Sequence, residues 1–351
     1  MLVEKAIIAL SGGVDSSVCA HIMKTRGYEC EGVMFRLYDK HGENVADSDI
    51  SDAEKVAEKV GIPFSVIDYR DDFKRKVIDE FVAVYEKGGT PNPCIVCNRV
   101  IKFELLFNRL KEKNADKVVT GHYARVEYDS KAGRYLLKKA VDDSKDQSYV
   151  LYNLKKDQLK NIIFPLGELS KSEARQIAEK EGFVNAAKRD SQDICFVPDG
   201  NYGKFIEEYR GKRFPSGDFV SESGHVIGQH KGIIHYTIGQ RKGLGLALPC
   251  PMYVVKKDVF ENKVVLGYND ELFSDSLTAK DVNLISVDSI DTPMRVDAKV
   301  RYSQKAQPAY AVLLPDGRLS VKFDQPQRAI TPGQSVVLYD GDIVVGGGVI
   351  E

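Results

Sequence analysis

Strand-like and helix-like segments alternate along roughly the first third of the sequence. Residues 4–10 form the apolar run of a buried strand, residues 15–26 have helical periodicity that stops at Gly27, and residues 29–36 form a second apolar run. The order then recurs as a helix with capping-box spacing at Ser51 and Glu54, a strand at 63–68, a helix at 71–88, and a strand with its exit loop at 116–124. This alternation predicts an α/β fold with a doubly wound parallel sheet, whose ligand crevice lies at the carboxyl ends of its strands.

The remaining sequence predicts two further domains. From about Leu277 the segments 294–302, 309–324 and 334–350 are strand-like, with Asp-Gly turn signals at 316–317 and 340–341. We expect a small C-terminal antiparallel β-barrel there. Residues 200–270 are rich in glycine, basic residues and aromatics, and we assign them to a small middle domain. The predicted domains are 1–199, 200–272 and 273–351.

The composition indicates where the protein is located in the cell, but it says little about what the protein binds. Hydrophobic residues make up 43% of the 351, but no apolar run is long enough to span a bilayer, and a Gly-rich turn stands where a signal peptide needs its cleavage site. Six cysteines are too few for a disulfide scaffold. We therefore expect a cytoplasmic protein with reduced thiols. The net charge of −1 gives no support to nucleic-acid binding, which would need basic residues gathered on one face.

The segment SGGVDSS at 11–17 lies where a strand turns into a helix. Such a turn offers backbone N–H groups and the positive end of a helix to an anion, and Ser11, Ser16 and Ser17 add hydroxyl donors. It matches neither the Walker loop nor the dinucleotide GxGxxG. Asp15 is a candidate ligand for Mg²⁺, which prefers oxygen. The alternatives are a Gly/Ser turn that only caps a helix, and a carboxylate that only opposes the helix dipole.

Two further segments carry cysteines. TPNPCIVCNRVIKF at 90–103 is a proline-stiffened loop that runs into a helix, and the helix start together with Arg99 and Lys102 would favour the thiolate of Cys97. DSQDICFV at 190–197 presents Cys195 after a polar loop. Each cysteine alone would more often be a small buried hydrophobe. Cys94 and Cys97 also form a CxxC, but no second CxxC or histidine pair supplies further zinc ligands.

These segments together resemble the tRNA-specific 2-thiouridylase family over nearly the whole chain, and SGGVDS by itself resembles the pyrophosphate loop of the N-type ATP pyrophosphatases. The matching stretches are SGGVDSS, TPNP with CN and IKF, TGHYAR, KDQSYVLY, FPLGE, ICF, HYTIGQRKGLG and TPGQSVVLYDG.

The resemblance implies a role for particular residues. The residues that would contact ATP are Ala9, Leu10, Ser11, Gly12, Gly13, Val14, Asp15, Ser16 and Phe35, with Gly121 beside the adenine and ribose. Cys195 matches the cysteine that carries a persulfide, and Cys97 matches its partner nucleophile. The positions that match contacts to tRNA or the target base are Asn92, Pro93, Cys94, Lys145, Asp146, Gln147, Arg301 and Tyr302. The loop that holds Cys195 would become ordered when tRNA binds.

The implied reaction uses ATP, with Mg²⁺, to adenylate the 2-carbonyl oxygen of a tRNA uridine, most often the wobble uridine. The oxygen then departs with AMP after sulfur attacks the carbon. A cysteine persulfide is a suitable carrier because it is a soft nucleophile held in place. The implied partners are tRNA and a sulfur donor, either a cysteine desulfurase or a sulfur-relay protein.

Other residues have weaker or open interpretations. His122 can orient phosphate or ribose, or can be satisfied by the loop itself, and we leave it outside the catalytic set. The run at 240–245 can grip an RNA backbone or be a solvated basic turn. Cys94 stands where the family pattern has Asp, so it can act in proton transfer, resolve a disulfide, or only fill space.

Two other functions compete with this interpretation. An ATP-dependent ligase or amidotransferase would share the phosphate loop without needing Cys97 and Cys195. A noncatalytic RNA-binding protein would have no use for an intact phosphate loop.

Overall fold

The computed structural model describes residues 3–38, 45–188 and 194–351. Its N-terminal domain is built on a five-stranded, all-parallel sheet in the order β3-β2-β1-β4-β7. The strands are β1 (Lys5–Ala9), β2 (Glu29–Arg36), β3 (Phe64–Asp68), β4 (Lys117–Val119) and β7 (Ile162–Ile163). The predicted doubly wound α/β fold is confirmed.

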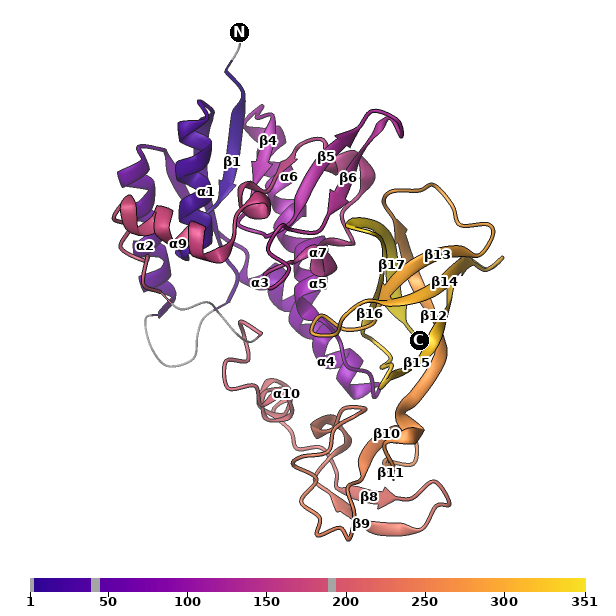
Figure 1. The fold of residues 1–351 in the computed structure, drawn as a ribbon. Helices are drawn as coiled ribbons and strands as arrows, with labels where there is room; N and C mark the ends of the chain where they lie inside the picture. The colour runs from indigo at the N-terminus through magenta and orange to yellow at the C-terminus, as the bar shows by residue number, and fades with distance from the viewer. Residues whose placement is uncertain (1–2, 39–44, 189–193) are drawn as a thin grey trace.

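Helices cover both faces of this sheet, because successive residues of β1 point to opposite sides. Ile8 packs into the core beneath α1, whereas Ile7 packs into a second core with α6. Figure 1 shows α1, α2 and α9 on one side and α6 on the other. The helices of the domain are α1 (Val14–Thr25), α2 (Val45–Val60), α3 (Arg70–Phe73), α4 (Asp79–Glu86), α5 (Pro93–Cys97), α6 (Phe103–Glu112), α7 (Ser148–Leu151), α8 (Lys156–Leu159) and α9 (Lys171–Lys180), with the π-helical turns η1 (Lys74–Ile78) and η2 (Asn98–Lys102) and the 3₁₀ turn η3 (Pro165–Glu168).

Two helix predictions need correction. The capping-box start at Ser51 is wrong, because α2 begins at Val45 and Ser51 lies inside it. Tertiary contacts outweigh the local pattern here, since Asp49 and Asp52 of α2 both pair with Lys188. The helix predicted at 71–88 is present, but the π-helical turn η1 interrupts it between α3 and α4.

The middle domain holds a four-stranded sheet in the order β10-β11-β8-β9, and α10 leads into it. The domain lies at the bottom of Figure 1. Its elements are α10 (Tyr202–Arg210), β8 (Gly217–Val220), β9 (Val226–His230), η4 (Ile233–His235), β10 (Tyr253–Asp258), β11 (Lys263–Gly267) and η5 (Asp270–Leu272).

The C-terminal domain is a closed antiparallel barrel of six strands, as predicted, because β12 pairs with both β15 and β17. A hairpin from the N-terminal domain attaches to the barrel where β17 begins, since Lys138 of β6 pairs with Ile343. No pattern in the sequence indicated this link between the two domains. The barrel strands are β12 (Phe273–Leu284), β13 (Met294–Lys299), β14 (Gln307–Leu313), β15 (Leu319–Arg328), β16 (Ser335–Asp340) and β17 (Ile343–Ile350), and the hairpin strands are β5 (Arg125–Asp129) and β6 (Arg134–Lys138).

Candidate active site

The phosphate loop joins β1 to α1 at the carboxyl edge of the sheet. Gly12 adopts φ +69°, a conformation that a side chain would strain. The hydroxyls of Ser16 and Ser17 both donate to the carbonyl oxygen of Gly13, each at 3.0 Å. These two hydroxyls therefore shape the loop and are not free donors for an anion, contrary to the sequence-based expectation. The loop retains the positive end of α1 for a phosphate.

Asp15 is engaged with two neighbours. Lys171 donates to its two carboxylate oxygens at 2.7 and 2.9 Å, and the Tyr123 hydroxyl donates to it at 2.9 Å. Lys171 is nearly buried, with 12% of its side chain exposed. A magnesium ion at Asp15 would have to displace this ammonium group. Within the described residues, no group of three His, Cys, Asp or Glu is placed to hold a metal ion.

The TGHYAR segment meets the phosphate loop, as its place after β4 suggested. A Cβ at Gly121 would lie 3.1 Å from the Asp15 Cβ and from the Ser16 nitrogen, so a glycine suits this close approach. His122 is buried, its Nδ1 lies 2.7 Å from the Thr120 hydroxyl, and burial lowers its pKa to about 3. A neutral, satisfied histidine of this kind supports leaving it outside the catalytic set.

The cysteine loop enters α5 through a side-chain cap. The Asn92 Oδ1 accepts from the backbone nitrogens of Cys94 at 3.2 Å and Ile95 at 3.4 Å, and Pro93 takes the first helical position. Asn92 and Pro93 thus position the two cysteines of the helix. Cys94 is exposed, whereas Cys97 is buried in the apolar core that joins α4, α5 and the middle domain.

The structure brings Cys195 to this pair from a segment almost a hundred residues further along the chain. Cys94 and Cys195 are each close enough to Cys97 to raise its pKa electrostatically. Phe196 anchors the segment, because its ring packs against Phe73 at 5.8 Å and Phe81 at 5.2 Å between centroids. All six cysteines lie in the described part of the chain and are free thiols.

The expectation of a Cys97 thiolate is wrong. Cys97 is 7% exposed, and this burial raises its pKa to about 12 despite the opposing effect of Lys102. Desolvation also raises the pKa values of Cys94 and Cys195, although both residues keep exposed surface. The helix start and the neighbouring cations therefore do not compensate for the lost water, and all three groups rest as neutral thiols.

Sequence reasoning missed Tyr38, which forms a side-chain hydrogen bond with Cys195 that opposes the rise in the thiol pKa. Tyr38 lies two residues beyond the carboxyl end of β2, where ligand-facing residues of such a sheet gather. That position was the available signal. Phe35, on β2 itself, is half-buried and packs edge-to-face against Tyr69 at 5.8 Å.

Residues 145–147, which are predicted to contact tRNA, form hydrogen bonds that stabilise their own loop. Asp146 accepts from the Ala140 nitrogen at 3.0 Å and from the Ser148 hydroxyl at 2.7 Å, while Gln147 accepts from the Tyr123 nitrogen at 3.0 Å. Lys145 donates its backbone nitrogen to the Asp142 carbonyl at 3.0 Å.

Arg301 and Tyr302 differ in their availability. The Arg301 guanidinium donates to the carbonyl oxygens of Ile238 at 3.1 Å and Ala329 at 3.0 Å, and to the Thr331 hydroxyl at 2.6 Å, so it ties the barrel to the middle domain. Tyr302 is 44% exposed, its pKa is raised by burial, and it lies close enough to Cys94 for that thiol to raise the Tyr302 pKa further.

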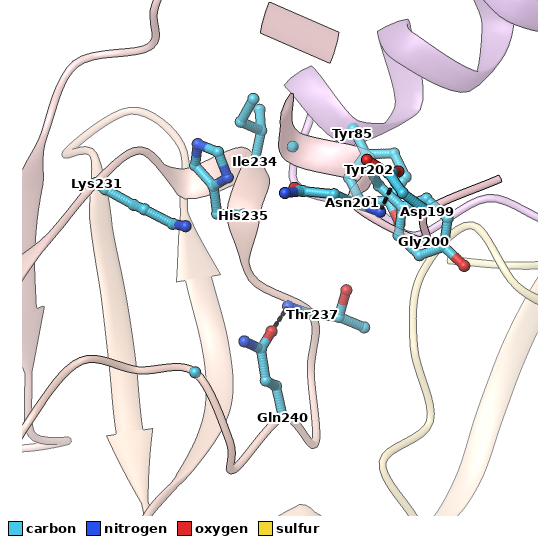
Figure 2. A pocket seen from close by; sticks show the side chains of 12 residues that line it. Tyr85, Asp199, Gly200, Asn201, Tyr202, Lys231, Ile234, His235, Thr237 and Gln240 are labelled. Atoms are coloured by element: carbon cyan, nitrogen blue, oxygen red, sulfur yellow. Dashed lines mark hydrogen bonds between the residues drawn. The ribbon is translucent and has the colours of Figure 1, made fainter. Parts of the chain in front are cut away.

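A polar cavity of about 420 Å³ opens between the start of α10 and the segment 231–243 of the middle domain, and Figure 2 shows its lining. Lys231 and His235 lie on one wall and Asp199 and Asn201 on the other. Gln240, from the basic run at 240–245, also lines it, and its Oε1 accepts from the Thr237 nitrogen at 3.0 Å.

The fold and site together define a three-domain protein in which an α/β nucleotide-binding type of domain carries a phosphate loop and a thiol cluster. Three family models match in order: a tRNA methyl transferase HUP domain at 4–199, a tRNA methyl transferase PRC-barrel domain at 203–268 and an aminomethyltransferase beta-barrel domain at 274–350. The chain belongs to the tRNA-specific 2-thiouridylase family, because full-length relatives that carry this name are about half identical to it.

Close relatives carry that name over their full length. The chain is 52% identical to tRNA-specific 2-thiouridylase MnmA 2 of Caldanaerobacter subterraneus subsp. tengcongensis, with 99% of this chain and 98% of the relative covered. It is 50% identical to the MnmA of Acetivibrio thermocellus, with 99% of each covered, and 48% identical to that of Clostridioides difficile, with 99% and 98% covered. No helix within the described residues is long and apolar enough to cross a membrane.

Proposed function

We propose that this chain is a tRNA-uridine 2-sulfurtransferase that uses ATP to activate the uridine carbonyl and supplies sulfur from a cysteine. Its family membership over the full length supports this function. The observation that carries the proposal is the meeting of Cys97 and Cys195 from distant segments, in a domain that also presents a phosphate loop.

ATP suits the loop between β1 and α1. The positive φ of Gly12 bends the backbone toward the end of α1, which favours a bound phosphate. Gly121 and Phe35 are the candidate neighbours of the nucleoside. Mg²⁺ would accompany ATP, with Asp15 as its protein ligand after Lys171 is displaced.

The chemistry divides into activation and sulfur transfer. The uridine 2-oxygen attacks the α-phosphate of ATP and pyrophosphate leaves, so that the oxygen can later depart as part of AMP. The terminal sulfur of a Cys195 persulfide then attacks the uridine carbon. Cys97 finally attacks the Cys195 sulfur, which releases the 2-thiouridine and leaves a Cys97–Cys195 disulfide for an external dithiol to reduce.

The high pKa of Cys97 fits this sequence of steps. A buried neutral thiol is a poor nucleophile, so Cys97 does not attack a loaded persulfide before the uridine is in place. Cys97 would have to lose its proton before it attacks, and Lys102, the nearby cation that lowers the Cys97 pKa, favours that step.

The tRNA would approach along exposed groups of all three domains. Tyr302 offers an exposed ring near Cys94 for stacking on an unstacked base, and Arg241 and Lys242 are exposed on the middle domain for phosphate contacts. The polar cavity in Figure 2 adjoins this basic run. The target is the wobble uridine, by resemblance to the family.

The sulfur would come from a cysteine desulfurase or a sulfur-relay protein that docks where Cys195 is exposed. Such chemistry needs free thiols, and the cytoplasm keeps them reduced. We therefore place the reaction in the cytoplasm.

The decisive experiment incubates the protein with ATP, unmodified tRNA and a persulfide donor, and then measures nucleosides by mass spectrometry. We expect 2-thiouridine, with one AMP and one pyrophosphate for each, and none when ATP or the donor is omitted. ATP consumption with ammonia or an amino acid in place of sulfur would instead identify a ligase or amidotransferase. Binding of tRNA without thiolation would identify a noncatalytic RNA-binding protein.

A further inference from the structure

Lys188 joins three segments of the catalytic domain with one ammonium group. Its Nζ lies 3.2 Å from the Gly12 carbonyl oxygen, 2.7 Å from a carboxylate oxygen of Asp49 and 2.8 Å from one of Asp52. Gly12 belongs to the phosphate loop, whereas Asp49 and Asp52 belong to α2. The three N–H donors of a lysine are thereby matched to three acceptors. No step of the proposed reaction accounts for this arrangement.

The helix that Lys188 holds lies directly on the phosphate loop. A Cβ at Gly12 would be 2.3 Å from the Asp49 carbonyl oxygen, so the two backbones are in close contact. Asn185 also bonds to the phosphate loop and to α1, because its Nδ2 donates to the Gly12 carbonyl oxygen at 3.0 Å and to the Ser17 hydroxyl at 2.9 Å. The Asn185 Oδ1 is buried and has no hydrogen-bond partner within the described residues.

The charges at this contact oppose a bound phosphate. Asp49 and Asp52 place two carboxylates over a loop that would take a polyanion, and Lys188 neutralises only one of the two charges. Like charges repel, and this repulsion is stronger at a partly buried site than in bulk water. A phosphate group that enters the loop therefore competes with both carboxylates for the same ammonium group.

We propose that Lys188 is a phosphate-binding residue that exchanges its carboxylate partners for a phosphate oxygen of ATP. In the arrangement described here it holds α2 on the loop. When ATP binds, the ammonium moves to the phosphate and releases Asp49 and Asp52. The inference rests on the proposed function, because it requires ATP in the loop at 11–17. It adds a ligand about 170 residues away from the loop in sequence that no motif indicates.

The test measures equilibrium binding of a non-hydrolysable ATP analogue, with no tRNA present. We expect Lys188→Gln to weaken binding about tenfold or more, since a charge-assisted hydrogen bond to phosphate is lost. Lys188→Arg should keep most of the affinity. The double variant Asp49→Asn with Asp52→Asn should bind the analogue several-fold more tightly, because the competing acceptors lose their charge.

Lys59→Gln is the matched control. Lys59 lies on the same helix and donates to the Gly182 carbonyl at 3.0 Å, away from the loop, so its loss should leave binding unchanged. A thermal unfolding curve of each variant without nucleotide confirms that it is folded.

Equal binding by the wild type and Lys188→Gln overturns the inference while leaving the proposed function in place. Weaker binding by the double asparagine variant also overturns it. If the ion pair only maintained the structure, replacing either Lys188 or the two carboxylates would lower the affinity for the ATP analogue. If the wild type binds no ATP analogue, the proposed function fails together with the inference.

Discussion

The phosphate loop and the thiol cluster are built by opposite means. Around the loop, polar groups are fixed by ion pairs and hydrogen bonds, as with Lys171 on Asp15 and Lys188 on Asp49. Around Cys97 the neighbours are apolar, and the thiol is kept neutral by lack of water. The charged groups of the loop are therefore in place before substrate binds. The thiols of the cluster are neutral at that stage and have to lose a proton before they can react.

The largest expected effect concerns the two catalytic thiols. Replacing Cys97 or Cys195 by Ser should lower thiolation by about a thousandfold or more, since a nucleophile is lost. The two variants should differ in an assay for bound sulfur: Cys195→Ser should carry no persulfide, whereas Cys97→Ser should load sulfur and fail to complete transfer. Cys250→Ser, a thiol of the middle domain, is the control and should be active. A persulfide trapped on Cys97 would reverse the assigned roles.

The next largest effect concerns the phosphate loop and its ion pairs. Asp15→Ala should abolish ATP-dependent adenylation, but it also removes the carboxylate that pairs with the nearly buried Lys171, so we expect a loss of roughly 1–3 kcal/mol in the free energy of unfolding. Ser11→Ala should lose adenylation with a smaller change in stability. Pyrophosphate release and denaturant unfolding measure the two quantities separately. Normal turnover by either variant would count against the loop as the ATP site.

A smaller, graded effect should follow from pH. Because the Cys97 pKa is raised to about 12, its thiolate is scarce at pH 7 and should increase about tenfold per pH unit up to pH 9. We expect alkylation of Cys97 by iodoacetamide to follow this slope in a variant with Cys94→Ala and Cys195→Ser. A plateau near pH 7 would mean that Cys97 is an activated thiolate after all.

The smallest expected effect is at Cys94, where the family pattern has Asp. We hypothesise that Cys94 is dispensable, since adenylation and persulfide attack already supply the leaving group and the nucleophile. Cys94→Ala should keep most thiolation activity when a reductant is present, within about twofold of the wild type. Activity lost in Cys94→Ala and restored in Cys94→Asp would instead assign acid/base chemistry to this position. Loss that only excess reductant repairs would point to disulfide resolution.

Much of the fold followed from local patterns. The order of strands and helices from β1 to β4 was predictable because the apolar period of a segment depends on residues next to one another in sequence. The start of α2 was not, because Asp49 and Asp52 owe their helical position to Lys188, more than a hundred residues away. Tyr38 and Phe196 were missed at the site for the same reason, since their partners Cys195 and Phe81 come from other segments.

The sequence alone determined which groups are available: a Gly/Ser phosphate loop after the first strand, a capped helix carrying Cys94 and Cys97, and a third thiol at Cys195. Only the tertiary structure decided their state. Packing against the middle domain buries Cys97 and keeps it protonated, against the expectation from Arg99 and Lys102. The tertiary structure also decided that Arg301 bonds to the barrel and the middle domain while Tyr302 remains exposed, and the tRNA contact of both residues stays a prediction. The physical reason is that backbone shape is set mainly by neighbours in the chain, whereas protonation and availability depend on water and charge brought or excluded by distant segments.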